Sequence, residues 1–133
     1  MLSFPRDKLP KNPKILIIKL RSIGDVVYNT AVYTPLKRSF PDCHLTVLVE
    51  NFSIDLVRHH PDVDQVLCFD KNSGLRQLDF YFRLFANRYD VVIDMHEGTR
   101  GAVMCFVTQA PYRVGHKFAK RSFLYNVKLE FGD

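Results

Sequence analysis

The segment that most constrains this fold is Lys14–Tyr28, which reads KILIIKLRSIGDVVY. Residues 15–20 are apolar except for Lys19, and such a short, isoleucine-rich run is typical of a strand buried on both faces of a parallel sheet. The run enters a turn at residues 21–25, after which a helical pattern begins. In an α/β sheet the first strand-to-helix turn lies at the carboxyl ends of the strands, where ligands bind. Asp25 is therefore expected at the mouth of the crevice and is our principal candidate for chemistry.

The same alternation of short apolar runs and helical patterns continues along the chain. Further strands are expected at residues 45–49, 63–69, 89–94 and 111–114, and from Val127 onward. Helices are expected at residues 26–39, 53–58, 75–87 and 100–108, with Pro35 kinking or dividing the first. This order predicts an α/β fold, a Rossmann-like parallel sheet with helices on both faces and right-handed crossovers.

Apolar spacing in two of these helices predicts which sides face the core. In helix 75–87 the side chains near helical spacing are Leu78, Phe82 and Phe85, and we interpret the aromatic residues Tyr81, Phe82 and Phe85 as core and interface. Arg83 and Arg88 are assigned to the helix surface. In helix 100–108 the core side is expected to consist of Ala102, Val103, Phe106 and Val107.

The composition sets the remaining limits. With 133 residues the chain is expected to form one domain, with an irregular lead-in at 1–13 and the Rossmann-like domain at 14–133. No apolar run approaches the roughly 18 residues of a membrane span, and the first residues lack a signal-peptide core. Cys43, Cys68 and Cys105 show no CxxC spacing, which predicts buried, reduced thiols and a cytoplasmic location.

Four stretches of the sequence together resemble one enzyme family. In chain order they are Ser22–Asp25, then Phe40–Asp42 with Val49-Glu50 and His60–Asp64, then Tyr89–His96 with Gly98 and Arg100, and last Tyr112–Gly115 with Arg121 and Phe123–Asn126. Taken in this order, they resemble the amino-terminal half of the ADP-heptose:lipopolysaccharide heptosyltransferases, glycosyltransferase family 9. Most members of that family carry a second serine where this chain has Arg21, which either contacts an anion or points to solvent.

The resemblance implies a GT-B glycosyltransferase, in which two Rossmann-like domains face each other across a cleft. This chain would be the acceptor-side domain, and the donor domain that holds most of the ADP-heptose would be absent from it. The whole enzyme would transfer heptose to the lipopolysaccharide inner core with inversion and without a cofactor or metal, whereas the chain alone would be inactive. A HExxH zinc motif would need histidine at position 100, where the chain has Arg100.

The family motif also implies roles for individual residues. Asp25 would be the base that takes the proton from the acceptor hydroxyl, although a helix-capping carboxylate explains this residue as well. Ser22 and Gly24 would offer backbone N–H groups to a phosphate or sugar oxygen. His96 would contact acceptor or phosphate, or would be a structural loop histidine. The remaining anion-binding candidates are Lys71, Arg76, Arg100, Lys117 and Arg121.

A net charge of +5 indicates an anionic partner. Under the resemblance, the partners are the lipopolysaccharide acceptor, the nucleotide-sugar donor and the anionic inner face of the inner membrane, with self-association of the isolated domain. No recognition-helix or RNA-binding motif indicates nucleic acid. The alternative to a glycosyltransferase is a protein of another functional class. It would be a stand-alone, flavodoxin-like binding or regulatory module without catalysis and with an anionic partner.

Overall fold

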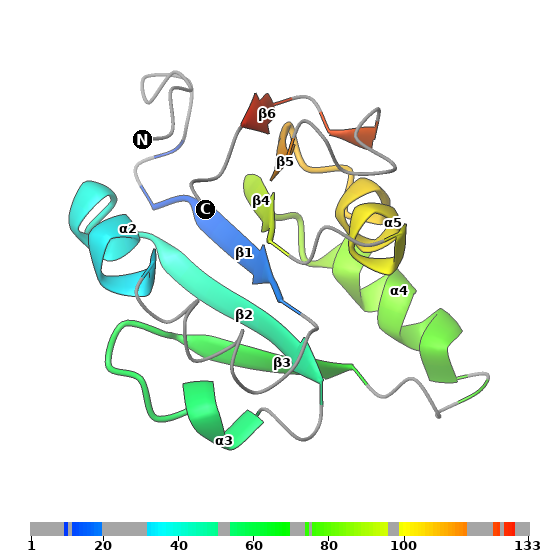
Figure 1. Ribbon diagram of the computed structural model, residues 1–133, viewed down its shortest axis with the longest axis horizontal. Coiled ribbons are helices and arrows are strands. Elements are labelled where there is room, and N and C mark those ends of the chain that lie inside the picture. The colour runs from blue at the N-terminus through cyan, green and yellow to red at the C-terminus, as the bar shows by residue number, and fades with distance from the viewer. Residues whose placement is uncertain are drawn as a thin grey trace.

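A computed structural model shows six strands and four helices among the described residues. These residues are 12–19, 32–50, 54–69, 76–95, 99–116 and 127–129, together with Pro10, Gly74, Leu124 and Tyr125. The strands are β1 (Lys14–Ile18), β2 (His44–Glu50), β3 (Gln65–Phe69), β4 (Val91–Asp94), β5 (Tyr112–His116) and β6 (Val127–Leu129). The helices are α2 (Tyr33–Ser39), α3 (Ile54–Val57), α4 (Arg76–Ala86) and α5 (Thr99–Val107) (Figure 1).

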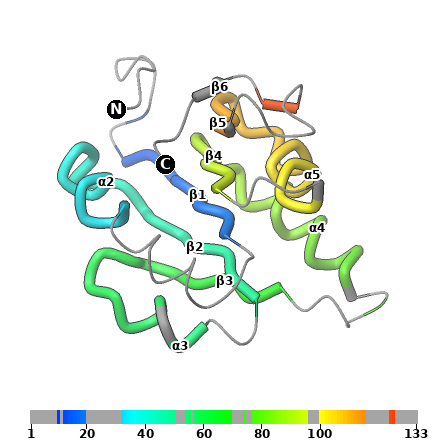
Figure 2. The backbone as a smooth tube through the Cα atoms, in the orientation of Figure 1, coloured from blue at the N-terminus to red at the C-terminus, as the bar shows by residue number. Residues whose placement is uncertain are grey.

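The strands form one parallel sheet in the order β3-β2-β1-β4-β5-β6. This is the Rossmann order and differs from the flavodoxin-like order. The chain moves outward from β1 through β2 to β3 and then crosses back to place β4 on the other side of β1, a path that can be followed in Figure 2. The predicted Rossmann-like α/β fold is confirmed, including the strand that starts at Val127.

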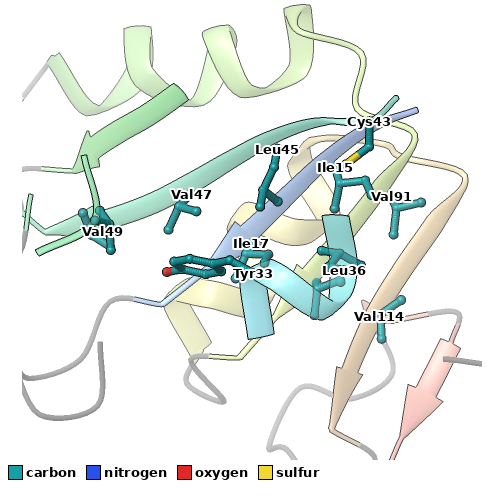
Figure 3. Close-up of a cluster of buried hydrophobic side chains, with 12 residues drawn as sticks. Ile15, Ile17, Tyr33, Leu36, Cys43, Leu45, Val47, Val49, Val91 and Val114 are labelled. Carbon is teal, nitrogen blue, oxygen red and sulfur yellow. The ribbon is translucent and has the colours of Figure 1, made fainter. Parts of the chain in front are cut away.

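Alternation along the strands sends side chains into two separate cores. On one face, Ile15 and Ile17 pack with Tyr33 and Leu36 of α2 and with Val57 of α3 (Figure 3). On the other face, the even-numbered residues of β1 pack with α4 and α5. Because side chains in a strand point alternately to opposite faces, a strand that is apolar throughout requires helices on both sides of the sheet, as predicted.

The first described helix begins later than its apolar pattern. α2 starts at Tyr33, so Pro35 lies in its first turn, where a missing N–H removes no intrahelical hydrogen bond. The amino-terminal part of the predicted helix 26–39 lies outside the described residues. At the other end of α2, the Phe40 N–H donates to the Leu36 carbonyl at 3.0 Å and closes the last turn.

The predicted core sides of α4 and α5 were wrong in part. Leu78, Phe82 and Phe85 are exposed, and the side chain that α4 buries completely is Leu84. In α5, Val103 and Phe106 are exposed. Ala102 is buried as predicted, and it is joined in the core by Met104 and Cys105. Both helices carry apolar residues over more of their circumference than the sheet can cover.

The cysteine prediction holds for two of the three thiols. None of the three cysteines forms a disulfide, and Cys43 and Cys105 are buried. Cys68 is only half-buried, because β3 is an edge strand and only its last residue, Phe69, is fully covered.

Candidate functional site

The carboxyl ends of β1 and β4 form the point at which the strand order reverses. β1 leads outward to β2 on one side, and β4 leads to β5 on the other, so the connections that leave these two strands diverge. In open α/β sheets such a divergence leaves a crevice outside the strand ends, and ligands bind there. The last paired residues at this edge are Ile18 and Asp94.

Lys19 ties the tips of three strands together at this edge. Its N–H donates to the Leu48 carbonyl at 3.0 Å, and its ammonium donates to the Met95 carbonyl at 2.8 Å. The Met95 N–H in turn donates to the Ile18 carbonyl at 3.0 Å. These bonds fix the starting points of the two connections that follow β1 and β4, and they explain why a lysine interrupts an otherwise apolar strand.

Asp94 is a fully buried carboxylate at the end of β4. The hydroxyl of Tyr125 donates to its Oδ2 atom at 2.5 Å, and the Tyr125 ring lies against Gly115 of β5. Burial raises the pKa of the neighbouring Cys105 thiol, and the charge of Asp94 raises it further. Asp94 therefore joins β4 to the segment around Tyr125 and holds the crevice edge on the α5 side.

Arg100 lies in the first turn of α5 and is exposed. Its guanidinium carbon is 5.2 Å from the centre of the Phe69 ring, and Phe69 is the last residue of β3. The Phe69 ring packs edge-on against Phe80 of α4 at 5.3 Å. A cation held over an aromatic face at the carboxyl edge of the sheet remains available to an anion.

Most of the site residues predicted from the sequence lie outside the described residues. This holds for Asp25, Ser22, Gly24, Lys71, His96, Lys117 and Arg121. Arg76 is described only as the first residue of α4. Arg100 is the one predicted site residue whose side chain the structure describes. The described residues contain no cluster of three or more side chains that could hold a metal ion.

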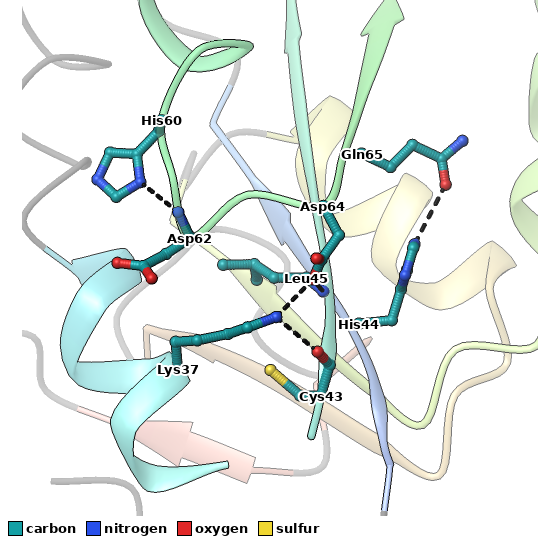
Figure 4. A network of polar contacts seen from close by, with 8 residues as sticks. All are labelled: Lys37, Cys43, His44, Leu45, His60, Asp62, Asp64 and Gln65. Carbon is teal, nitrogen blue, oxygen red and sulfur yellow. Dashed lines mark hydrogen bonds and ion pairs between the residues drawn. The ribbon is translucent and has the colours of Figure 1, made fainter. Parts of the chain in front are cut away.

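Three aspartates of the family-like stretches lie at the opposite edge of the sheet and hold the fold together. Asp64 accepts from the Leu45 N–H at 2.8 Å and from the Lys37 ammonium at 2.6 Å (Figure 4). Asp62 accepts from the Thr34 hydroxyl. Asp90 Oδ2 accepts from the backbone N–H of β1's first residue at 2.8 Å. These carboxylates orient the amino ends of the strands and not the crevice.

The charge of Asp64 is stabilised by its partners. Burial alone would raise the pKa of Asp64, but the hydrogen bonds from the Leu45 N–H and from Lys37 outweigh burial and lower that pKa. The Lys37 ammonium also donates to the Cys43 carbonyl at 2.7 Å, so a single lysine links α2, β2 and the start of β3 (Figure 4).

Sequence reasoning assigned no site role to Lys19, Asp94, Gly115 or Tyr125. The signal for Asp94 was present, because the predicted strand at 89–94 ends in a carboxylate, just as the predicted strand at 63–69 runs into Asp70. Its partner lies 31 residues away along the chain, and no local pattern connects the two.

The comparisons with known proteins agree with this architecture. Lipooligosaccharide heptosyltransferase 2 of Haemophilus influenzae is 27% identical over 115 residues, which are 84% of this chain and 33% of that protein. Lipopolysaccharide heptosyltransferase 3 of Escherichia coli is 23% identical over 127 residues, 86% of this chain and 37% of that protein. The chain therefore spans about a third of the length of these curated relatives. No family model matches it.

Solved structures share the fold. The E. coli heptosyltransferase WaaC with ADP superposes with a TM-score of 0.75 and 23% identity, over 90% of this chain and 41% of that chain. The E. coli ADP-heptose lipopolysaccharide heptosyltransferase II superposes with a TM-score of 0.75 and 22% identity, over 89% and 35%. The resemblance to heptosyltransferases that the motifs indicated is confirmed.

Proposed function

We propose that this chain, whose curated relatives are heptosyltransferases, forms the amino-terminal, acceptor-binding part of an inverting glycosyltransferase. The whole enzyme would transfer heptose from ADP-heptose to the lipopolysaccharide inner core. The observation that supports the proposal is the reversal of strand order between β1 and β4, because ligands of α/β sheets bind at such a reversal and the family-like motif follows β1 in the sequence.

The reaction needs two kinds of group. A base removes the proton from an acceptor hydroxyl as its oxygen attacks the anomeric carbon, and the bond from that carbon to the ADP oxygen breaks with its electrons leaving on ADP. Asp25, which follows β1, is the proposed base. The departing diphosphate and the anionic acceptor both need positive charge or N–H dipoles nearby.

The described part of this crevice supports the anion-binding half of the proposal. The ammonium of Lys19 is held by the Met95 carbonyl, and the exposed guanidinium of Arg100 lies over the Phe69 ring. Arginine binds carboxylates and phosphates through two parallel hydrogen bonds. We assign acceptor binding to Arg100, together with Lys71, Arg76, His96, Lys117 and Arg121 of the neighbouring segments.

The acceptor-binding claim is tested with the 133-residue chain. A de-acylated, heptose-free core oligosaccharide is titrated into the chain in a calorimeter, and saturable binding is expected. Arg100→Gln should weaken binding about tenfold, the loss of one charge-assisted hydrogen bond. Arg38→Gln, at the last turn of α2, is the matched control and should bind like the parent. Absence of saturable binding, or equal binding by the Arg100→Gln variant, would contradict the proposal.

The catalytic claim needs a complete enzyme. The chain replaces the corresponding region of Lipooligosaccharide heptosyltransferase 2 of Haemophilus influenzae, and transfer from labelled ADP-heptose to a heptose-free acceptor is measured. Asp25→Asn in this chimera should abolish transfer while leaving the circular dichroism spectrum and the acceptor affinity unchanged. Retained turnover by the Asp25→Asn variant would remove Asp25 from the role of base.

A further inference from the structure

The ring of Phe69 lies where three elements meet at the carboxyl edge of the sheet. Phe69 is the last residue of the edge strand β3, and it is buried in the core that α4 and α5 share with the sheet. Its ring packs edge-on against Phe80 of α4, with the ring centres 5.3 Å apart. The guanidinium carbon of Arg100, in the first turn of α5, lies 5.2 Å from the centre of the same Phe69 ring. One aromatic ring therefore contacts both helices.

The contact between Arg100 and Phe69 joins parts of the fold that the sheet separates. Arg100 belongs to the helix that follows β4, and β1 and β2 lie between β4 and β3. The helix that connects β3 to β4, α4, packs beside α5 (Figure 1). Burial raises the pKa of Tyr81 in α4 and the charge of Arg100 lowers it, so the guanidinium also lies close to α4. The Arg100 side chain thus extends from α5 to the tip of the edge strand.

Phe69 is suited to hold a cation because its own ring is fixed. Side chains in a packed interior occupy single rotamers, and the edge-on contact with Phe80 orients the Phe69 ring further. The face of an aromatic ring carries the negative part of its quadrupole and attracts a guanidinium. The ion pairs among the described residues do not include Arg100. The ring is therefore the group that restrains this exposed side chain, and its charge is left for a ligand.

We propose that Phe69 is a positioning residue, whose ring fixes the Arg100 guanidinium at the carboxyl edge of the sheet by cation–π attraction before an anion binds. Ordering a long side chain on binding costs affinity, and a side chain that is already ordered avoids this cost. The guanidinium itself makes the hydrogen bonds to a carboxylate or phosphate group. That this anion belongs to the sugar acceptor rests on the proposed function, whereas the fixing of Arg100 by Phe69 does not.

The first experiment measures the motion of the Arg100 side chain in the 133-residue chain without any ligand. Nuclear spin relaxation of the Arg100 Nε–H group gives its order parameter, and Arg100→Gln assigns the signal by removing it. The order parameter should match that of rigid backbone, about 0.85, in the parent and fall below about 0.6 in the Phe69→Leu variant. Phe82→Leu, the same change at an exposed ring of α4, is the matched control and should leave it unchanged. Equal order parameters in the parent and in Phe69→Leu would overturn the inference.

A fluorinated ring separates the attraction from the packing of the core. Replacing Phe69 by a trifluorinated phenylalanine keeps the ring in place and withdraws negative charge from its face. The order parameter of Arg100 should therefore fall again, although the core stays filled. Circular dichroism confirms that each variant is folded. An Arg100 side chain that stays as ordered over the fluorinated ring as over the natural one would also overturn the inference.

The second experiment measures the consequence for binding. The heptose-free core oligosaccharide is titrated into the parent, into Phe69→Leu, into Arg100→Gln and into the double variant. Phe69→Leu should weaken binding about fivefold in the parent chain and should have no effect in the Arg100→Gln chain. Equal weakening in both chains would mean that Phe69 acts on the fold and not through Arg100, which contradicts the inference. A parent chain that binds no oligosaccharide would contradict the proposed function, and the order parameter of Arg100 would still decide whether Phe69 positions it.

Discussion

Replacing Gly115 by alanine tests whether the crevice edge is held by direct packing of Tyr125 on β5. An added Cβ at this position would lie 2.3 Å from Cδ2 and Cε2 of the Tyr125 ring and 2.4 Å from Cζ. Real Cβ atoms do not come this close to other heavy atoms, so the ring has to move. Tyr125 is buried, and displacing its ring also pulls its hydroxyl away from Asp94.

The expected cost has two parts. Forcing an extra carbon into a packed interior costs about 1–3 kcal/mol. Losing a hydrogen bond to a buried carboxylate costs about 1.5–3 kcal/mol. Opposing these, alanine in place of glycine in a strand reduces the entropy of the unfolded chain and contributes about 0.4–1 kcal/mol of stability. We expect Gly115→Ala to lower the free energy of unfolding by about 2–5 kcal/mol.

Urea denaturation followed by circular dichroism measures this change, and a double-mutant cycle assigns it. In a Tyr125→Ala background the ring is absent, so Gly115→Ala should be close to neutral. Tyr125→Phe isolates the hydroxyl and should cost only the hydrogen-bond part. The reasoning is refuted if Gly115→Ala is tolerated in the parent chain, or if its cost is the same with and without the tyrosine ring.

Two further predictions concern titrating groups. Because the pKa of Asp64 is lowered in the folded chain, its contribution to stability is present above the ordinary carboxyl range, about pH 4, and is lost as the pH falls through the folded pKa. Asp64→Asn should therefore lower the urea midpoint near pH 6, and the difference from the parent chain should narrow as the pH falls below about 4. A difference in urea midpoint that does not change with pH would contradict this. Burial raises the pKa of Cys105 and of Cys43, whereas Cys68 is only half-buried. Cys68 should react first with a thiol reagent at pH 8, and Cys68→Ser should remove that fast phase; a fast phase that persists would place the reactive thiol elsewhere.

The alternation of apolar runs and helical patterns was enough to predict the fold class. A run such as residues 15–18 is apolar at every position, so it fits only a strand covered on both faces, and strands that alternate with helices along the chain allow few arrangements. The family-like motifs predicted the enzymes that the chain resembles. None of the helices the structure describes is long and apolar enough to span a membrane.

Sequence patterns did not predict which helical faces are buried. In α4 apolar residues occupy more than half of the circumference, and spacing alone favours Leu78, Phe82 and Phe85 as readily as Leu84. Only the packing of α4 on the sheet and against α5 shows that Leu78, Phe82 and Phe85 face outward. Sequence periodicity therefore did not predict which apolar side chains of α4 and α5 stay exposed.

Periodicity is a property of neighbouring residues, and so the sequence by itself determined the strands, the helices and the parallel sheet they build. The structural role of each single polar residue depends on contacts that only the tertiary structure makes. Asp64 and Asp94 look alike in sequence, each beside an apolar strand, yet one anchors the amino edge of the sheet through Lys37 and the other meets Tyr125 at the carboxyl edge. Lys37 lies 27 residues from Asp64 and Tyr125 lies 31 residues from Asp94 along the chain, and only the packing of these distant segments in the folded chain brings each pair within hydrogen-bonding distance.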